Sequence, residues 1–284
     1  MRKIKKILFI WCMGLMMSLP NYAGILNTPI AVPNKLSNER PDYRWMTSSY
    51  VGYAWSGLAG IANPNPKQFN AVKPGDTDDG NFGNVAYAGF SLSRKFSKYY
   101  LLSFSYDVYG AFVYRRYHQT ATAPERQAGV EILGIPYSRS FSLDHQGALF
   151  NLILDLPKKF EYVYKEMHLK PACSGGIGMG ISKVKNFQSL GFTDIVPYSQ
   201  ITTISPTSTT INFAWQCTVG LGMRPRNSAV SFGVAYRYYN GGRFASSNIF
   251  ILNDDENMGQ PVQLTAWSGK LRTQQLKMYI NAEF

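Results

Sequence analysis

The chain has 284 residues, of which only 16% are charged and 14% are aromatic, and its formal net charge is +12 at pH 7. This composition excludes an intrinsically disordered protein, because disordered chains are rich in charge and poor in aromatic residues. The positive charge alone would allow nucleic-acid binding, but the Lys and Arg residues after residue 23 form no compact cluster. We therefore expect no nucleic-acid partner.

The first 23 residues have the pattern of a secretory signal peptide. A basic start over residues 1–6 precedes an apolar stretch of 13 residues over 7–19, which is too short to span a bilayer as a helix. A membrane anchor is therefore the less favoured interpretation. Cleavage before Gly24 would remove four cations and no anion, leaving a charge of about +8. Residues 24–48 are polar and rich in Pro and Asn, so we expect an irregular lead there.

From residue 49 onward, apolar residues alternate with other residues at a period of two, which is typical of β-strands with two different faces. Eight such segments are long enough to cross a bilayer as tilted strands of roughly 9–11 residues. In chain order they cover residues 50–59, 84–96, 100–108, 147–156, 169–184, 211–224, 230–238 and 275–284. The non-apolar face is rich in Gly, Ser, Ala and Gln, which suits the narrow interior of an eight-stranded barrel.

A soluble β-sandwich also alternates, so two further features favour a barrel. Long polar connections alternate with short links, as the external loops and periplasmic turns of membrane barrels do. The long connections are residues 60–83, 117–143, 185–207 and 241–263. The sequence also ends within its last strand, at Phe284, so we expect the first and last strands to pair and leave no open edge in lipid. The predicted fold is all-β, a transmembrane antiparallel up-and-down β-barrel of eight strands over residues 49–284.

Several segments resemble the opacity-protein and OmpA-type families of outer-membrane barrels. They are Phe-Ala-Trp-Gln and Val-Gly-Leu-Gly within 213–222, Gly-Val-Ala-Tyr-Arg-Tyr-Tyr over 233–239, and residues 148–155 and 170–180, which look like the fourth and fifth strands. The resemblance covers nearly all of residues 49–284 and implies location in the outer membrane of a Gram-negative bacterium. It implies no single activity, because these families include adhesins, surface antigens and minor channels. We expect no appended peptidoglycan-binding domain.

The final strand is similar to the C-terminal signal that the outer-membrane assembly machinery reads. Its apolar residues at every second position include Ile280, Ala282 and Phe284. The resemblance implies that these three side chains carry that signal, and a lipid-facing strand end is a compatible structural role. Outer-membrane lipid and lipopolysaccharide are the other expected partners, the latter through its phosphates.

Four charged residues, Asp107, Asp155, Arg237 and Lys277, have the parity of the lumenal face. Because an unpaired charge in a narrow barrel is costly, we expect these charges to pair and plug the lumen. Ion conduction through the lumen is the alternative. Aromatic girdles at the membrane interfaces are predicted from Tyr99, Tyr100, Trp215, Tyr236, Tyr238 and Tyr279, although the parity of Tyr279 is inward.

The remaining candidates for chemistry are weak. The Gly-rich run at 176–180 continues into a strand, whereas a phosphate-binding loop needs a following helix. We expect the three His residues, His118, His145 and His168, to be solvated in or beside separate connections, and the acidic clusters at 76–79 and 254–256 to be solvated loop charge rather than cation sites. Cys173 and Cys217 both have outward parity, so a disulfide is the less favoured possibility. We predict no metal and no cofactor.

Three functions remain open. The favoured one is a non-enzymatic surface protein, similar to an adhesin or surface antigen, whose long loops contact a host or environmental ligand. The second is a porin-like channel for ions or small solutes, which eight strands disfavour. The third is a lipid-modifying barrel enzyme, which would need a nucleophile and a positioned base that the strand pattern does not supply.

Overall fold

The computed structural model describes residues 45–62, 83–97, 99–118, 137–157, 160–164, 166–191, 200–252, 260–263 and 266–284. The predicted signal peptide at 1–23, residues 24–44 of the predicted lead and both acidic clusters lie outside the described residues. Residues 45–48, which we assigned to the lead, instead begin the first strand.

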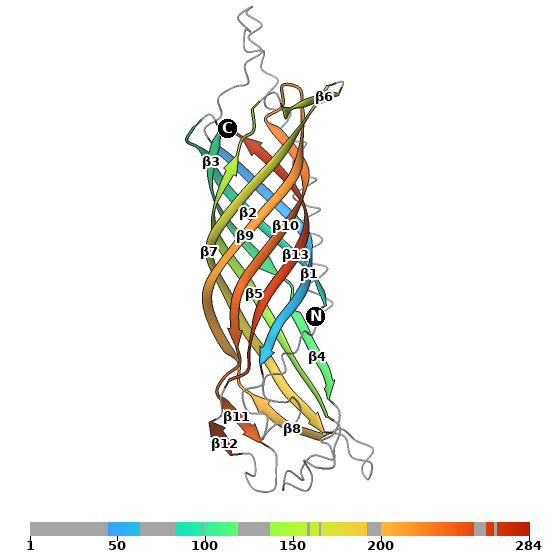
Figure 1. The fold of residues 1–284 in the computed structure, drawn as a ribbon, viewed down its shortest axis with the longest axis vertical. Coiled ribbons are helices and arrows are strands. Elements are labelled where there is room, and N and C mark those ends of the chain that lie inside the picture. The colour runs from blue at the N-terminus through green and yellow to red at the C-terminus, as the bar shows by residue number, and fades with distance from the viewer. Residues whose placement is uncertain are drawn as a thin grey trace, which may run out of the picture. The chain divides into compact units, whose positions relative to one another are not determined.

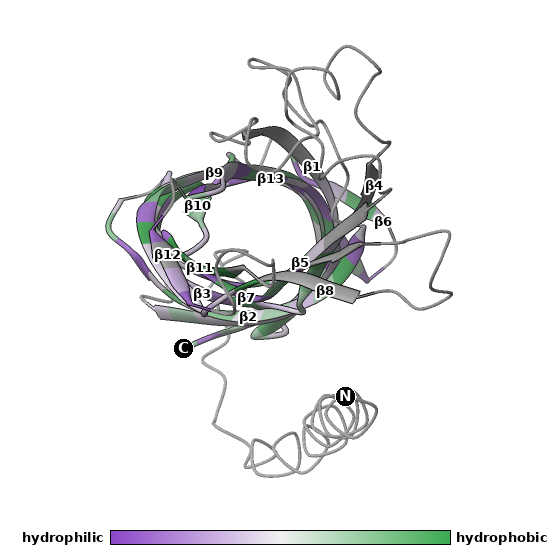
Figure 2. Ribbon diagram, turned by 90° about the horizontal axis from the view of Figure 1, so that it is seen from below, coloured by the Kyte–Doolittle hydropathy of each residue, from purple (hydrophilic) through white to green (hydrophobic). Residues whose placement is uncertain are grey.

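Eight long strands form a closed antiparallel barrel, as the sequence predicted (Figures 1 and 2). They are β1 (Trp45–Ala62), β2 (Asn84–Lys95), β3 (Tyr100–Tyr109), β5 (Tyr137–Leu154), β7 (Met167–Gly191), β9 (Ser208–Pro225), β10 (Val230–Ala245) and β13 (Ser268–Glu283). Each pairs with the next long strand in the chain. The ring closes because β13 also pairs with β1 along nearly its whole length, from Met46–Glu283 to Ala62–Ser268.

The two ends of the barrel differ. The C-terminus, the short links β2–β3 and β9–β10, and the small strand β6 (Tyr162–Tyr164) lie at one end (Figure 1). The other end carries the short strands β4 (Phe112–His118), β8 (Gln200–Ser205), β11 (Ile249–Leu252) and β12 (Pro261–Gln263). Since long connections are external and short turns periplasmic, the end with β8, β11 and β12 is the external one.

The predicted long connections are partly wrong, because much of them is strand. Residues 137–143 belong to β5, residues 185–191 to β7 and residues 241–245 to β10. The reason is an inversion of the two faces along each strand. On β5, Phe150 and Leu152 point outward to lipid, whereas towards the external end Phe141 and Leu143 point inward and are buried. If apolar residues are assumed to point outward throughout, each strand is therefore predicted to end before it does.

Glycines opposite tyrosines shape the lumen within the membrane. Gly52 pairs with Tyr87, Gly89 with Tyr50, and Gly233 with Tyr279 on adjacent strands. A Cβ on Gly233 would lie only 2.5 Å from the Tyr279 hydroxyl, so the ring of Tyr279 folds over the glycine towards the lumen. Tyr279 is therefore an inward residue, as its parity indicates. The small residues on this face make room for large side chains from neighbouring strands.

Candidate functional site in the barrel lumen

Arg237 of β10 is the centre of a polar network in the lumen. Its Nη1 donates to Asp107 Oδ2 at 3.0 Å and to Gln216 Oε1 at 2.9 Å, its Nη2 donates to the Tyr109 hydroxyl at 2.8 Å, and its Nε donates to Gln275 Oε1. Asp107 and Tyr109 lie on β3, which is not a neighbour of β10 in the sheet. The contacts therefore cross the lumen, and both charged residues are fully buried.

The ion pair is enclosed by further polar contacts. The Tyr50 hydroxyl donates to Asp107 Oδ1 at 2.7 Å, and the guanidinium of Arg237 lies 4.8 Å from the centre of the Tyr87 ring. Gln216 also donates to Asn151, which reaches it from β5. A buried ion pair persists only when such hydrogen bonds satisfy its remaining donors and acceptors. This network therefore links β1, β2, β3, β5, β9, β10 and β13 through the centre of the barrel.

His145 is also part of the lumen, which corrects the expectation of a solvated loop histidine. Because β5 begins at Tyr137, His145 lies inside a strand with inward parity, and it is 1% exposed. Its Nδ1 lies 2.9 Å from Ser182 Oγ and its Nε2 lies 2.7 Å from the Tyr239 hydroxyl. A serine hydrogen-bonded to a histidine can form a nucleophile–base pair. Here both residues are buried, and the second ring nitrogen of His145 is hydrogen-bonded to the Tyr239 hydroxyl.

The other two histidines lie on strands as well. His168 on β7 contacts Glu161 Oε1 at 2.6 Å near the periplasmic end. His118 is the last residue of β4, and its side chain lies outside the described part.

The four charges predicted to face the lumen have different environments. The structure brings Asp107 and Arg237 together. Lys277 lies between two rings, with its Nζ 4.8 Å from the centre of Tyr50 and 5.9 Å from that of Tyr279.

Asp155 lies just past the end of β5, away from the central network. It accepts from Lys170 and forms an ion pair with Lys95 at 3.4 Å. Three charged residues thus pair at the periplasmic mouth, separately from the pair in the middle of the lumen.

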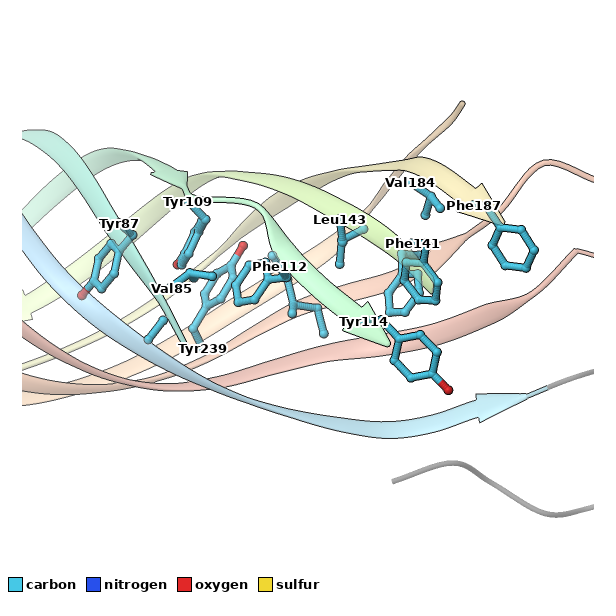
Figure 3. Close-up of a cluster of buried hydrophobic side chains, with 14 of the residues drawn as sticks. Val85, Tyr87, Tyr109, Phe112, Tyr114, Phe141, Leu143, Val184, Phe187 and Tyr239 are labelled. Carbon is cyan, nitrogen blue, oxygen red and sulfur yellow. The ribbon is translucent and has the colours of Figure 1, made fainter. Parts of the chain in front are cut away.

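Above the polar network, the external part of the barrel has an aromatic core (Figure 3). The ring of Phe141 lies 4.8 Å from Tyr114, 6.0 Å from Phe187 and 5.9 Å from Phe244, centre to centre. Phe187 in turn lies 5.7 Å from Phe250. These rings come from β4, β5, β7, β10 and β11, and all are buried. The lumen is therefore filled by polar side chains at one level and by packed rings at the next.

Most members of the central network were not predicted as site residues from the sequence. Gln216, Gln275, Tyr50, Tyr109 and Tyr239 all have inward parity, and that signal was available. Among inward residues that are mostly Gly, Ser and Ala, large hydrogen-bonding side chains mark the positions that fill the lumen.

The remaining candidates can be placed directly. Gly176, Gly178 and Gly180 lie in the middle of β7, paired with β5 and β9. Cys173 pairs with Val219 and Cys217 with Gly175, so the two cysteines are offset along adjacent strands and both are free thiols. In the described part of the chain, no group of three or more His, Cys, Asp or Glu residues is placed to hold a metal ion.

The last strand ends in direct contact with the first. The backbones of Phe284 and Trp45 exchange two hydrogen bonds, of 3.0 and 3.1 Å. The ring of Phe284 is exposed on the outside, and Ile280 and Ala282 share its outward parity.

The outer wall shows where the barrel lies. Its outward side chains are apolar over a continuous belt that includes Phe90, Phe104, Phe150, Phe213 and Met278, all exposed. Among the described residues, no helix is long and apolar enough to cross a membrane. A closed antiparallel barrel with an apolar outer wall and a polar, filled interior is the structure of proteins that span the bacterial outer membrane with β-strands. The chain is an outer-membrane β-barrel.

Comparisons with known proteins do not extend this assignment. No protein-family model and no curated protein matches the chain. Among solved structures, the barrel is similar to neisserial surface protein A (9% identity, TM-score 0.37, 84% of this chain and 97% of that one). It is also similar to the attachment invasion locus protein of Yersinia pestis (14% identity, TM-score 0.29, 85% of this chain and 99% of that one). A third similar structure is the outer membrane protease OmpT from Escherichia coli (8% identity, TM-score 0.49, 87% of this chain and 99% of that one). At these identities and TM-scores, the similarities assign neither a family nor an activity.

Proposed function

We propose that this barrel is a non-enzymatic surface protein, similar to an adhesin or surface antigen, whose external end contacts a host or environmental ligand. The observation that carries the proposal is a group of exposed isoleucines on the external strands, Ile204 on β8 with Ile249 and Ile251 on β11. Their side chains are 43%, 46% and 39% exposed, and Ile204 and Ile251 are partners in the sheet. Exposed aliphatic residues that gather in one place mark contact surfaces.

These isoleucines lie beyond the reach of lipid. Ile204 pairs with Gln188 of β7, and Lys183 of the same strand already has an exposed, charged side chain on the outer wall. Gln188 is five residue steps along the strand from Lys183, which corresponds to about 16 Å. Phe250, between the two isoleucines of β11, is fully buried and packs on Phe187, so a rigid core supports the exposed face. An apolar surface at this height suits a protein or glycan partner outside the cell.

The filled lumen supports a scaffold more than a channel. The guanidinium of Arg237 and the carboxylate of Asp107 are paired across the lumen, and aromatic rings pack above them. Eight strands leave an interior that side chains can fill completely. Ion or solute conduction is thus the weaker alternative. Lipid modification has less support, because the buried pair of Ser182 and His145 faces the interior rather than lipid.

The contact surface can be tested by display on bacterial cells. Cells carrying the wild-type chain should bind to at least one of an epithelial monolayer, fibronectin, laminin or collagen more than cells without it. The triple variant Ile204→Ser/Ile249→Ser/Ile251→Ser should lose most of that binding, because its apolar contact area is removed while Phe250 stays in place. The matched control Thr207→Ser/Thr209→Ser, at two exposed positions of the same external end, should bind as the wild type does. Equal binding by the triple variant and the wild type would contradict the proposal.

The family resemblance is a further part of the proposal. The sequence segments at 213–222 and 233–239 lie on β9 and β10, on both sides of the turn that joins these strands. We propose that the chain belongs to the opacity-protein and OmpA-type group, and those two segments support the proposal.

Phe284 offers a separate test of the assembly signal. Its ring is exposed and contacts lipid rather than the barrel interior, so Phe284→Ser should leave the stability of the folded barrel nearly unchanged. If Ile280, Ala282 and Phe284 form the signal for the assembly machinery, the same variant should reach the outer membrane in severalfold lower amounts. Membrane fractionation measures the amount, and refolding of the purified variant into lipid vesicles is the control. Normal amounts in the outer membrane would show that Phe284 is only a strand end.

A further inference from the structure

We infer that Arg243 on β10 with Lys270 and Arg272 on β13 forms a site on the outer wall for the phosphate groups of the outer-leaflet lipopolysaccharide. These three residues are called the basic patch here. Arg243 and Lys270 are direct partners across the two strands, and Arg272 follows two residues along β13, opposite Asn240. Neighbours at this spacing on one face of a sheet can bind the same ligand.

The backbone places these cations on the outside. On β13, Leu271 and Thr273 are buried in the lumen, so Lys270 and Arg272 face outward. On β10 the register shifts between Asn240 and Gly242, and Gly242 has a φ of 85°, which favours glycine. Without this bulge the alternation would turn Arg243 inward. With it, Phe244 joins the aromatic core and Arg243 is exposed.

The basic patch lies at the height of lipid headgroups. The outward residues of β13 are apolar from Phe284 through Leu276 and become polar at Gln274. Gln274 is ten residue steps from Phe284, which is about 25 Å of membrane height for a strand tilted by about 40° and rising about 3.3 Å per residue. That height equals the apolar band of an outer-membrane barrel. Arg272 and Lys270 therefore come just above the acyl chains of the outer leaflet.

The cations have no protein counter-charge in the described part of the chain. Among the described carboxylates, the one on the outer wall of the external half is Asp144, which is paired with Lys185. The others lie in the lumen or at the periplasmic end, where Asp155, Glu161 and Glu283 have basic partners. Like charges directly opposite each other destabilise a sheet, so Arg243 facing Lys270 is a cost to the isolated protein. An anion bound from outside removes that cost.

A phosphate group fits this site better than an uncharged sugar would. A guanidinium donates two parallel hydrogen bonds to a phosphate, and an ammonium adds a compact charge beside it. The apolar belt directly below, which includes the exposed Tyr236 and Leu276, would contact the acyl chains of the same molecule. A phosphorylated glycolipid thus satisfies both parts of the surface at once, and a free anion satisfies only one.

The test uses the whole chain purified from outer membranes in a zwitterionic detergent and stripped of lipid. Binding of lipopolysaccharide is titrated for the wild type and for Arg243→Gln/Lys270→Gln, and the control is Arg94→Gln/Arg226→Gln, which removes two exposed cations at the periplasmic end. We expect at least a tenfold weaker affinity for the patch variant and less than a twofold change in affinity for the control. The reason is that each cation near an anionic surface strengthens binding about fivefold, and the patch variant loses two of them. Wild-type binding should also fall at least tenfold for dephosphorylated lipopolysaccharide, and inorganic phosphate at equal concentration should not displace the lipid.

Unfolding provides a second readout that separates binding from misfolding. Without lipopolysaccharide, the patch variant should unfold at the same temperature as the wild type or higher, because the repulsion between opposed cations is gone. With lipopolysaccharide, the wild type should gain more thermal stability than the variant. The exchange Arg243→Lys/Lys270→Arg keeps both charges and should retain binding. The inference is overturned if the patch variant binds as tightly as the wild type, or if the wild type binds dephosphorylated lipopolysaccharide equally well.

Discussion

Arg237→Leu is expected to lower the free energy of unfolding by about 3–5 kcal/mol, the usual cost of breaking a buried ion pair from one side. The substitution leaves the carboxylate of Asp107 buried, and among the described residues its one remaining donor is the Tyr50 hydroxyl at 2.7 Å. It also removes the donors to Gln216, Gln275 and Tyr109. Urea unfolding of the barrel in lipid vesicles, followed by tryptophan fluorescence, measures the loss.

The double variant Asp107→Asn/Arg237→Leu is the matched comparison. Because it removes both charges, it should lose clearly less stability than the sum of the two single variants, and a coupling of about 1–3 kcal/mol is expected for residues in one network. Strictly additive losses would show that the two side chains do not interact in the membrane.

Phe141→Ala is expected to loosen the external part of the barrel, at a cost of about 3–5 kcal/mol for a buried phenylalanine. The ring of Phe141 contacts Tyr114, Phe187 and Phe244, which belong to three other strands, so its loss leaves a cavity between them. The barrel in vesicles should become severalfold more sensitive to protease added outside. Gel analysis of the fragments should place the new cuts in the external strands.

Phe150→Ala is the control for this prediction. Phe150 is on the same strand as Phe141 but points outward in the apolar belt, where lipid replaces the lost contact surface. External proteolysis should be unchanged. If both variants are cut equally, the external core does not hold this region together.

The barrel could be predicted from the sequence because every residue that faces lipid must be apolar. Outward residues such as Met278 and Phe213 must be apolar, so a period of two is visible and predicts the strands within the membrane. Above the membrane the rule reverses. Phe141 and Leu143 are apolar because they face a core, and the polar residues between them face water. The sequence pattern alone does not mark where the reversal occurs, so the external strands were predicted as loops.

The lumenal network was predictable in part. Parity alone places Asp107 and Arg237 inside the barrel, and the energetic cost of a lone buried charge argues that they pair. Their actual contact depends on the relative height of β3 and β10, which the stagger of eight tilted strands determines. The same limit applies to His145, whose place in the lumen required knowing that β5 begins at Tyr137.

Single-channel recording of the purified barrel in a planar lipid bilayer measures whether the lumen is sealed. Because Asp107 and Arg237 are paired across the lumen and aromatic rings pack above them, we expect a folded barrel that conducts no measurable current. Stable and reproducible conductance steps from the wild-type chain would contradict it.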